Sequence, residues 1–353
     1  GTNIASGSAI IIDTTAPTVI SFTSTTADGS YKSAGTVNIT ATVSETIVSG
    51  NTITVTLDTS DNVTLTAAAN GTTLVGTYTV SSGDTSSDLN VSSFSIGTVT
   101  DSAGNAMTST TVPATNIATG SAIVIDNTVP TIISFTSTTA DGSYKSTGTV
   151  NITATASEAV VSGNTITVIL DTGDSILLTA AANGTTLVGT YTVSSADTSS
   201  DLTVSSFSIG TVTDSAGNAM TSTTVPATNI ATGSAIVIDN TVPTIISFTS
   251  TTADGSYKST GTVNITATAS EAVVSGNTIT VTLDTGATVV LTAPANGTTL
   301  VGTYTVVAGN NSSDLTVSSF IIGTVTDSAG NAMSSNTLPA TNIDTDSDIV
   351  IST

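Results

Sequence analysis

A constant repeat length constrains this chain more than any other feature. The segment TNIASGSAIIIDTTAPT begins at Thr2, and close copies begin at Thr115, at Thr228 and, in part, at Thr341. Each copy starts 113 residues after the previous one. A constant period without insertions indicates one structural unit copied head to tail, and this period is too long for a solenoid turn of about 20–50 residues. We therefore predict three independent domains in the 353-residue chain.

Proline-containing segments mark the expected boundaries between the domains. The runs TTAPT, NTVPT and NTVPT follow Asp13, Asp126 and Asp239, and a proline there fixes φ and ends a strand ladder. The predicted repeats are residues 14–126, 127–239 and 240–353.

Residues 1–13 match 114–126, which form the final strand of a repeat, yet the third repeat has a final strand of its own in 343–351. We expect residues 1–13 to be the final strand of a preceding repeat or a linker, in a chain that is an interior piece of something longer. The alternative is a strand offered to another molecule.

The composition predicts an all-β fold. Thr, Ser, Asn, Val and Ile supply most of the chain, and these residues favour strands and turns over helices. In TVNITATV and NTITVTL, apolar residues alternate with Thr or Asn, so one face of each strand is expected in the core. About seven strands are predicted per repeat, which suits an immunoglobulin-like Greek-key β-sandwich, repeated three times in an elongated rod. In the first repeat they are 18–25, 36–43, 52–57, 63–67, 73–80, 91–99 and 122–126.

Four aromatic residues recur in every repeat and are expected to fill the core in place of Trp and Cys, which the chain lacks. In the first repeat they are Phe22, Tyr31, Tyr78 and Phe94.

The charge balance excludes several classes of function. The chain has 25 acidic residues against three Lys, and its formal net charge is −22. Nucleic acids and anionic membranes attract positive charge, so we expect neither as a partner, and cations are the natural ligands. Without His or Cys, a Ser-His-Asp triad, a Cys nucleophile or a His-bound metal is impossible, so no enzyme is expected. We find neither a basic and apolar leader nor a run of about 20 apolar residues, so direct membrane insertion is not expected.

Four short motifs recur in the same order in each repeat: IDTTAPT, ADGSYKSAG, VSETIVSG and VTDSAGNAM in the first copy. Together they resemble the bacterial immunoglobulin-like tandem repeats of large, RTX-type surface adhesins. The resemblance covers all three repeats and implies an extracellular or cell-surface extender that holds a terminal binding domain away from the cell, for example in a biofilm. The chain departs from many members after its Tyr-Lys pair, where Ser33-Ala34-Gly35 replaces Gly-Asp and removes one carboxylate.

Acidic loops at the ends of the repeats predict calcium. In a seven-stranded sandwich the start of the first strand, the second-to-third loop and the sixth-to-seventh loop share one pole. Carboxylates gathered there repel each other unless a hard cation neutralises them, and Ca²⁺ takes six to eight oxygen ligands. Zn²⁺ would prefer the absent His and Cys. The expected ligands are Asp13, Glu45, Asp101 and Asn105; Asp126, Glu158, Asp214 and Asn218; Asp239, Glu271, Asp327 and Asn331.

The opposite pole is also acidic, and there Asp28, Asp141 and Asp254 are further candidate ligands. The alternative for the first pole is that Asp101 and Asn105 only cap a turn while Glu45 is a solvated charge.

Other functions remain open alternatives to an extender. The chain can be a subunit of an extracellular filament or surface layer that self-associates through the N-terminal strand. Binding of a glycan or host protein by the repeats is disfavoured because aromatic and Arg anchors are scarce. One Lys per repeat, Lys32, Lys145 and Lys258, raises the further alternative of an isopeptide crosslink.

Overall fold

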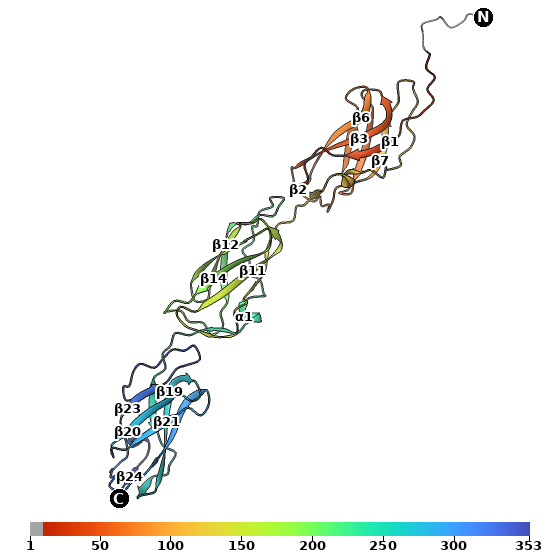
Figure 1. Ribbon diagram of the computed structural model, residues 1–353. Coiled ribbons are helices and arrows are strands. Elements are labelled where there is room, and N and C mark those ends of the chain that lie inside the picture. Colours follow the sequence, from red (N-terminus) through yellow and green to blue (C-terminus); the bar gives the residue numbers. More distant parts are fainter. Residues whose placement is uncertain (1–9) are drawn as a thin grey trace, which may run out of the picture.

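The computed structural model describes residues 10–353 and shows three similar β domains arranged end to end in an extended rod (Figure 1). The first domain contains β1 (Val19–Thr23), β2 (Gly29–Tyr31), β3 (Thr36–Ile47), β4 (Thr52–Leu57), β5 (Asn62–Thr66), β6 (Gly71–Thr79), β7 (Val91–Thr98), a 3₁₀ turn (Ile117–Thr119) and β8 (Ile123–Ile125). The expectation of an all-β chain with three repeated domains is confirmed in this architecture.

The second and third domains repeat the same order of elements. The second has β9 (Ile132–Thr136), β10 (Gly142–Tyr144), β11 (Thr149–Val160), β12 (Thr165–Leu170), β13 (Ser175–Thr179), β14 (Gly184–Thr192), β15 (Val204–Thr211), α1 (Ile230–Gly233) and β16 (Ile236–Ile238). The third has β17 (Ile245–Thr249), β18 (Gly255–Tyr257), β19 (Thr262–Val273), β20 (Thr278–Leu283), β21 (Thr288–Thr292), β22 (Gly297–Thr305), β23 (Val317–Thr324), α2 (Ile343–Asp346) and β24 (Ile349–Ile351).

Each domain is built on one curled antiparallel sheet of six strands, in the order β1-β3-β6-β5-β4-β7 in the first repeat. The two halves of the sheet are joined by β5, which pairs along its length with β4 but meets β6 only at Thr66 and Val75. The sheet therefore folds over on itself at β5 and encloses the core between its halves.

A separate parallel pair, β2 with β8, closes each domain. The short strand β2 was not among the predicted strands, because Asp28-Gly29 indicated a turn and the three residues Gly29–Tyr31 carry no alternation. Its partner lies about ninety residues further along the chain, at Ile123–Ile125. The described repeat thus has eight strands where about seven were expected.

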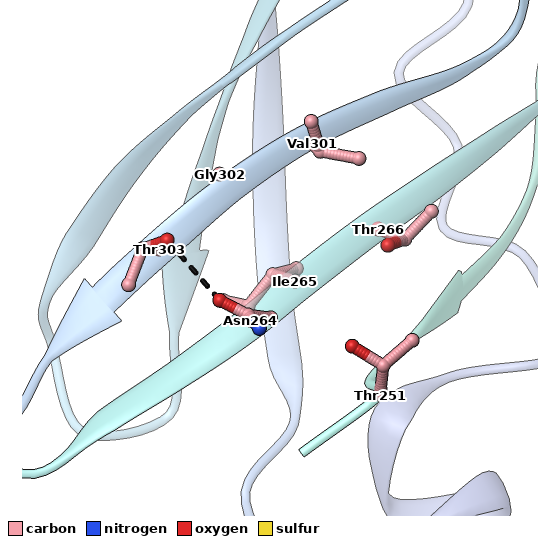
Figure 2. A pocket seen from close by; sticks show the side chains of 7 residues that line it. All are labelled: Thr251, Asn264, Ile265, Thr266, Val301, Gly302 and Thr303. Atoms are coloured by element: carbon pink, nitrogen blue, oxygen red, sulfur yellow. Dashed lines mark hydrogen bonds between the residues drawn. The ribbon is translucent and has the colours of Figure 1, made fainter.

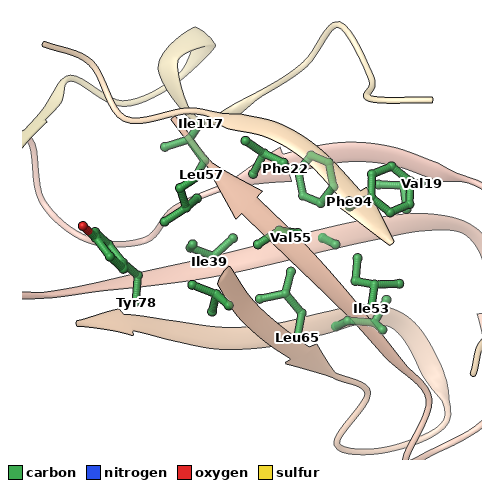
Figure 3. Close-up of a cluster of buried hydrophobic side chains, with 14 of the residues drawn as sticks. Val19, Phe22, Ile39, Ile53, Val55, Leu57, Leu65, Tyr78, Phe94 and Ile117 are labelled. Carbon is green, nitrogen blue, oxygen red and sulfur yellow. The ribbon is translucent and has the colours of Figure 1, made fainter. Parts of the chain in front are cut away.

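The core follows the predicted alternation. Val37, Ile39 and Ala41 are fully buried on β3, as are Ile53 and Val55 on β4. Figure 3 shows Ile39, Ile53 and Val55 among the buried side chains of this core. The interpretation of these strands as half-buried, with Thr and Asn toward water, is confirmed.

Aromatic residues also occupy their expected places. Phe22 and Phe94 pack edge to face with ring centroids 5.6 Å apart, and Tyr78 is buried toward the other end of the same core (Figure 3). Tyr31 is half-buried and packs against this cluster. Its hydroxyl donates a hydrogen bond to the carbonyl of Ala27, so it braces the loop that leads into β2.

Of the N-terminal copy, residues 1–9 lie outside the described residues. Ile10, Ile11 and Ile12 are 66%, 86% and 86% exposed and are part of no strand, whereas the matching residues of β8 are paired. The two alternatives for residues 1–13 therefore stay predictions.

Candidate metal centre at the joints

The joint between two repeats is very short. On one side, the main-chain N–H of Asp126 donates to the carbonyl of Tyr31, and the side chain of Asn127 bonds to Ser33, Ser81 and Asp84 of the first repeat. On the other side, Thr131 bonds to Ser157 of the second repeat through both its N–H and its carbonyl. Only residues 128–130 lie between these two anchored positions, so the linker leaves little room for a hinge.

Three carboxylates meet at this joint. Asp126 ends the first repeat, Glu158 lies on β11, and Asp214 lies in the loop after β15, and one oxygen of each lies within 4.8 Å of the others. Two oxygens on opposite sides of one Ca²⁺ are separated by about 4.6–5.2 Å, so this spacing fits a shared ion. The first and third repeats gather the equivalent triads Asp13, Glu45 and Asp101, and Asp239, Glu271 and Asp327. The three places predicted to share one pole are thus brought together, and the triads can hold a metal ion.

The glutamate is the unsatisfied member of the triad. In all three repeats its Oε1 atom is buried and receives no hydrogen bond from the described residues. Burial, and then the neighbouring charges of Asp126 and Asp214, raise the pKa of Glu158 above its ordinary value. The pKa of Glu271 is raised for the same reasons by burial, Asp239 and Asp327. A buried carboxylate oxygen without a donor, among two other carboxylates, has the electrostatics of a cation ligand. The alternative of a solvated loop charge does not describe a glutamate on a strand with a buried oxygen.

Asp214 and Asn218 form a turn as well. The N–H of Asn218 donates to Asp214 Oδ1 at 2.8 Å, and its side-chain Nδ2 donates to Asp214 Oδ2 at 2.7 Å and to the carbonyl of Asp126 at 2.9 Å. The alternative prediction, that the aspartate and the asparagine of this loop cap a turn, therefore describes these two residues, and the turn lies next to the triad. Because its nitrogen faces these acceptors, Asn218 positions the two aspartates across the joint. As direct metal ligands, Asn105, Asn218 and Asn331 remain predictions.

The same turn in the first repeat shows the electrostatic effect of these bonds. Hydrogen bonds from the side chain of Asn105 and from main-chain N–H groups outweigh burial and hold the pKa of Asp101 below its ordinary value. Asp101 therefore stays ionised in mildly acidic solution.

The three candidate aspartates at the opposite pole accept hydrogen bonds from main-chain N–H groups. Asp28 Oδ1 accepts the N–H of Ala122, and Asp141 and Asp254 accept the corresponding N–H groups of Ala235 and Asp348. These bonds fix the entry into the final strand of each repeat. None of the three belongs to an acidic triad in residues 10–353, so their role as metal ligands stays a prediction.

One acidic cluster was not singled out from the sequence. In the third repeat, Asp254 lines a small pocket of about 200 Å³ with Asp344, Asp346 and Asp348. The first repeat has Ala118, Gly120 and Ala122 at the matching positions. A comparison of the repeats position by position would have found this difference.

Open grooves lie on the sheets at equivalent places in the three repeats. One of about 500 Å³ lies over β19 and β22 and is lined by Thr251, Asn264, Ile265, Thr266, Val301, Gly302 and Thr303 (Figure 2). Thr303 donates to Asn264 at 3.2 Å within it. The groove carries no ionisable side chain and therefore has no acid–base group to offer a substrate.

Comparison with protein-family models and with curated protein sequences gives no match. No helix in the described part of the chain is long and apolar enough to span a membrane. The repeats and their joints therefore supply the functional argument.

Proposed function

We propose that this chain is a structural extender segment of a secreted or cell-surface bacterial adhesin, with immunoglobulin-like Greek-key domains stiffened by Ca²⁺ at their joints. The observation that carries the proposal is the division of the second and third triads between neighbouring repeats. Asp126 is anchored to the first repeat by its N–H, while Glu158 and Asp214 belong to the second. An ion bound by all three ties one domain to the next.

The mechanism is mechanical and involves no catalysis. Interfaces between tandem domains are small and mobile by default, so a repeat array without further contacts bends at every linker. Calcium at each joint converts three mutually repelling carboxylates into a shared ligand set and restricts the orientation of the domains. The parallel β2–β8 pair supports an immunoglobulin-like assignment, because it places the final strand of each domain beside the start of the same domain, next to the joint.

The test compares the full chain with millimolar Ca²⁺ and with a chelator. Thermal unfolding reports stability, and small-angle scattering reports the maximum dimension and the spread of shapes. Calcium should raise the unfolding midpoint and give a longer, narrower distribution of dimensions. If neither quantity responds, calcium is absent from the mechanism and the chain is a plain acidic spacer. Surface location has its own test: an antibody against the chain should label intact cells of the source organism, and a signal only after lysis contradicts it.

The filament subunit remains the second candidate, because Ile10–Ile12 form an exposed apolar segment. Removal of residues 1–13 should abolish assembly of a filament subunit but leave an extender monodisperse in size-exclusion chromatography.

A further inference from the structure

A pair of neighbouring carboxyl groups, Asp61 and Asp84, lies at the end of the first repeat opposite its own triad of Asp13, Glu45 and Asp101, and close to the joint with the second repeat. Tyr78 is buried and donates from its hydroxyl to Asp84 Oδ2 at 2.5 Å, and the N–H of Ser81 donates to the same oxygen at 2.5 Å. Asp61, from the turn between β4 and β5, lies within hydrogen-bond reach of the Asp84 carboxyl. The Oδ2 atom of Asp61 is buried and receives no hydrogen bond from the described residues.

Within residues 10–353, no lysine forms an ion pair with these carboxyl groups. The ammonium group of Lys32, at the same end of the domain, bonds to the carbonyl of Gly217 in the next repeat. Asp58, in the same turn as Asp61, adds negative charge and accepts from Ser86 and Asn90. Two carboxylates in contact cannot both ionise without compensation, and a proton held between them supplies the missing hydrogen bond.

The pKa values of the two groups separate in the way a shared proton requires. The hydrogen bond to Asp84, and then burial, raise the pKa of Asp61. Burial alone would also raise the pKa of Asp84, but hydrogen bonds from Tyr78 and Ser81 hold it below its ordinary value. Tyr191, Asp174 and Asp197 repeat the arrangement in the second domain.

The third repeat shows the same turn without the acids. Ala287 replaces Asp61, and Asn310 replaces Asp84. The hydroxyl of Tyr304 donates to Asn310 Oδ1 at 2.8 Å, and the N–H of Val307 donates to the same atom at 3.2 Å. Both carboxyl groups are lost together, and the hydrogen bonds of the turn are kept. That is the expected outcome when the two acids function as one protonated unit.

The turn also holds the linker. The side-chain Nδ2 of Asn127 donates to the carbonyls of Ser81 and Asp84 at 3.0 and 2.9 Å, and its Oδ1 accepts the N–H of Ser33 at 2.7 Å. Asn127 directly follows Asp126 of the metal triad. A change in the turn around Asp84 is therefore transmitted to the first residues of the joint.

We propose that the Asp61–Asp84 and Asp174–Asp197 pairs each hold one shared proton and act as pH-sensitive latches on the joints that follow the first and second repeats. Because the pKa of Asp61 is raised in the folded state, its contribution to the free energy of unfolding is lost as the pH rises through that folded-state pKa. Asp84 has the lowered pKa, so its contribution is lost as the pH falls through its own folded-state value. The turn therefore holds Asn127 in the pH range between the folded-state pKa of Asp84 and that of Asp61.

The protonation step is tested by NMR on the full chain labelled with ¹³C-aspartate, in chelator so that no metal competes. The wild type should show two aspartate carboxyl groups that titrate clearly above the others. Both should disappear in the variant D61A/D84N/D174A/D197N, which carries the residues of the third repeat. Glutamates of the metal triads are unlabelled and cannot give these signals. A wild type without the two raised titrations, or a variant that keeps them, overturns the proposal.

The mechanical step is tested by amide hydrogen exchange. The N–H of Ser33, which bonds to Asn127, should lose protection in the wild type as the pH rises through the raised titration, after correction for intrinsic exchange. The fourfold variant, whose third-repeat residues need no proton, should keep this protection. If Ser33 protection in the wild type is constant through the titration, the pair is not a latch.

Discussion

The ammonium group of Lys32 donates a hydrogen bond of 2.5 Å to the main-chain carbonyl of Gly217, in the loop of the next repeat that also carries Asp214. Beside it, the hydroxyl of Ser215 donates to that of Ser30 at 3.2 Å. Lys145 and Gly330 repeat the contact at the second joint. Lys32 and Lys145 are thus placed where they orient one domain against the next, which makes a role for these two as the amine of an intradomain isopeptide bond a poor fit to the geometry.

Replacing Lys32 and Lys145 with Met should loosen both joints without unfolding the domains. The substitution removes two charged hydrogen bonds that lie between domains and leaves each core intact. Small-angle scattering in calcium should show a broader distribution of maximum dimensions, while the thermal midpoint hardly changes. Lys258→Met is the matched control, because Lys258 makes no such bond across a joint in residues 10–353. Equal broadening in the control contradicts the orienting role.

Glu158→Gln should remove one calcium site of three. The chain contains only three glutamates, one in each triad, and glutamine keeps the size of the side chain but not its charge. Because ligand charge tunes calcium affinity, we expect a drop of about tenfold or more at this joint and a lower stoichiometry in calorimetric titration.

Asp141→Asn is the control for the calcium titration. Asp141 was a candidate ligand in the sequence, but in the structure its carboxylate accepts the N–H of Ala235. An unchanged calcium stoichiometry would assign it to the fold alone. A loss equal to that of Glu158→Gln would instead restore it as a ligand.

Alternation predicted the long strands well, since a half-buried strand must place every second residue in the core, as Val37, Ile39 and Ala41 do. It could not find β2, because three residues paired in parallel with a strand far along the chain leave no local pattern. Nor could it show that β5 joins the two halves of the sheet, since that depends on a single pair, Thr66 and Val75.

The triads were predictable because the order of strands decides which loops share a pole, and Glu158 and Asp214 lie in two such places. The direction of a side chain within a loop was not predictable. Asp28 bonds to a main-chain N–H, and Asn218 presents its nitrogen, because the partners available in three dimensions decide these orientations. Sequence shows which residue types are near a pole, and hydrogen bonding decides which of them remain free for a metal.

Calcium should reverse the pH dependence of stability. In chelator, the pKa values of Glu158 and Glu271 are raised in the folded state. Their contribution to the free energy of unfolding is therefore complete at acidic pH and is lost as the pH rises through these folded-state pKa values. In calcium, the same groups must be ionised to bind, so the calcium-induced gain in midpoint should grow with pH. Thermal unfolding from about pH 4 to about pH 8, with and without calcium, measures both trends. The variant E45Q/E158Q/E271Q should show neither the glutamate-dependent loss in chelator nor the gain in calcium, and a gain that persists there would place calcium elsewhere.

Gly189→Ala should destabilise the second repeat because the folded sheet leaves no room for a side chain. A Cβ atom at Gly189 would lie 2.5 Å from the carbonyl oxygen of Leu177 and 2.6 Å from Leu178 Cδ2, and the first of these is backbone that cannot rotate away. We expect a loss of about 1–3 kcal/mol in the free energy of unfolding of this repeat, measured by denaturant titration. Gly233→Ala, in the same repeat but with no atom within 4 Å of its added Cβ, should be neutral or slightly stabilising. Equal destabilisation by the two substitutions would mean that the close approach of β14 to β13 does not set the cost.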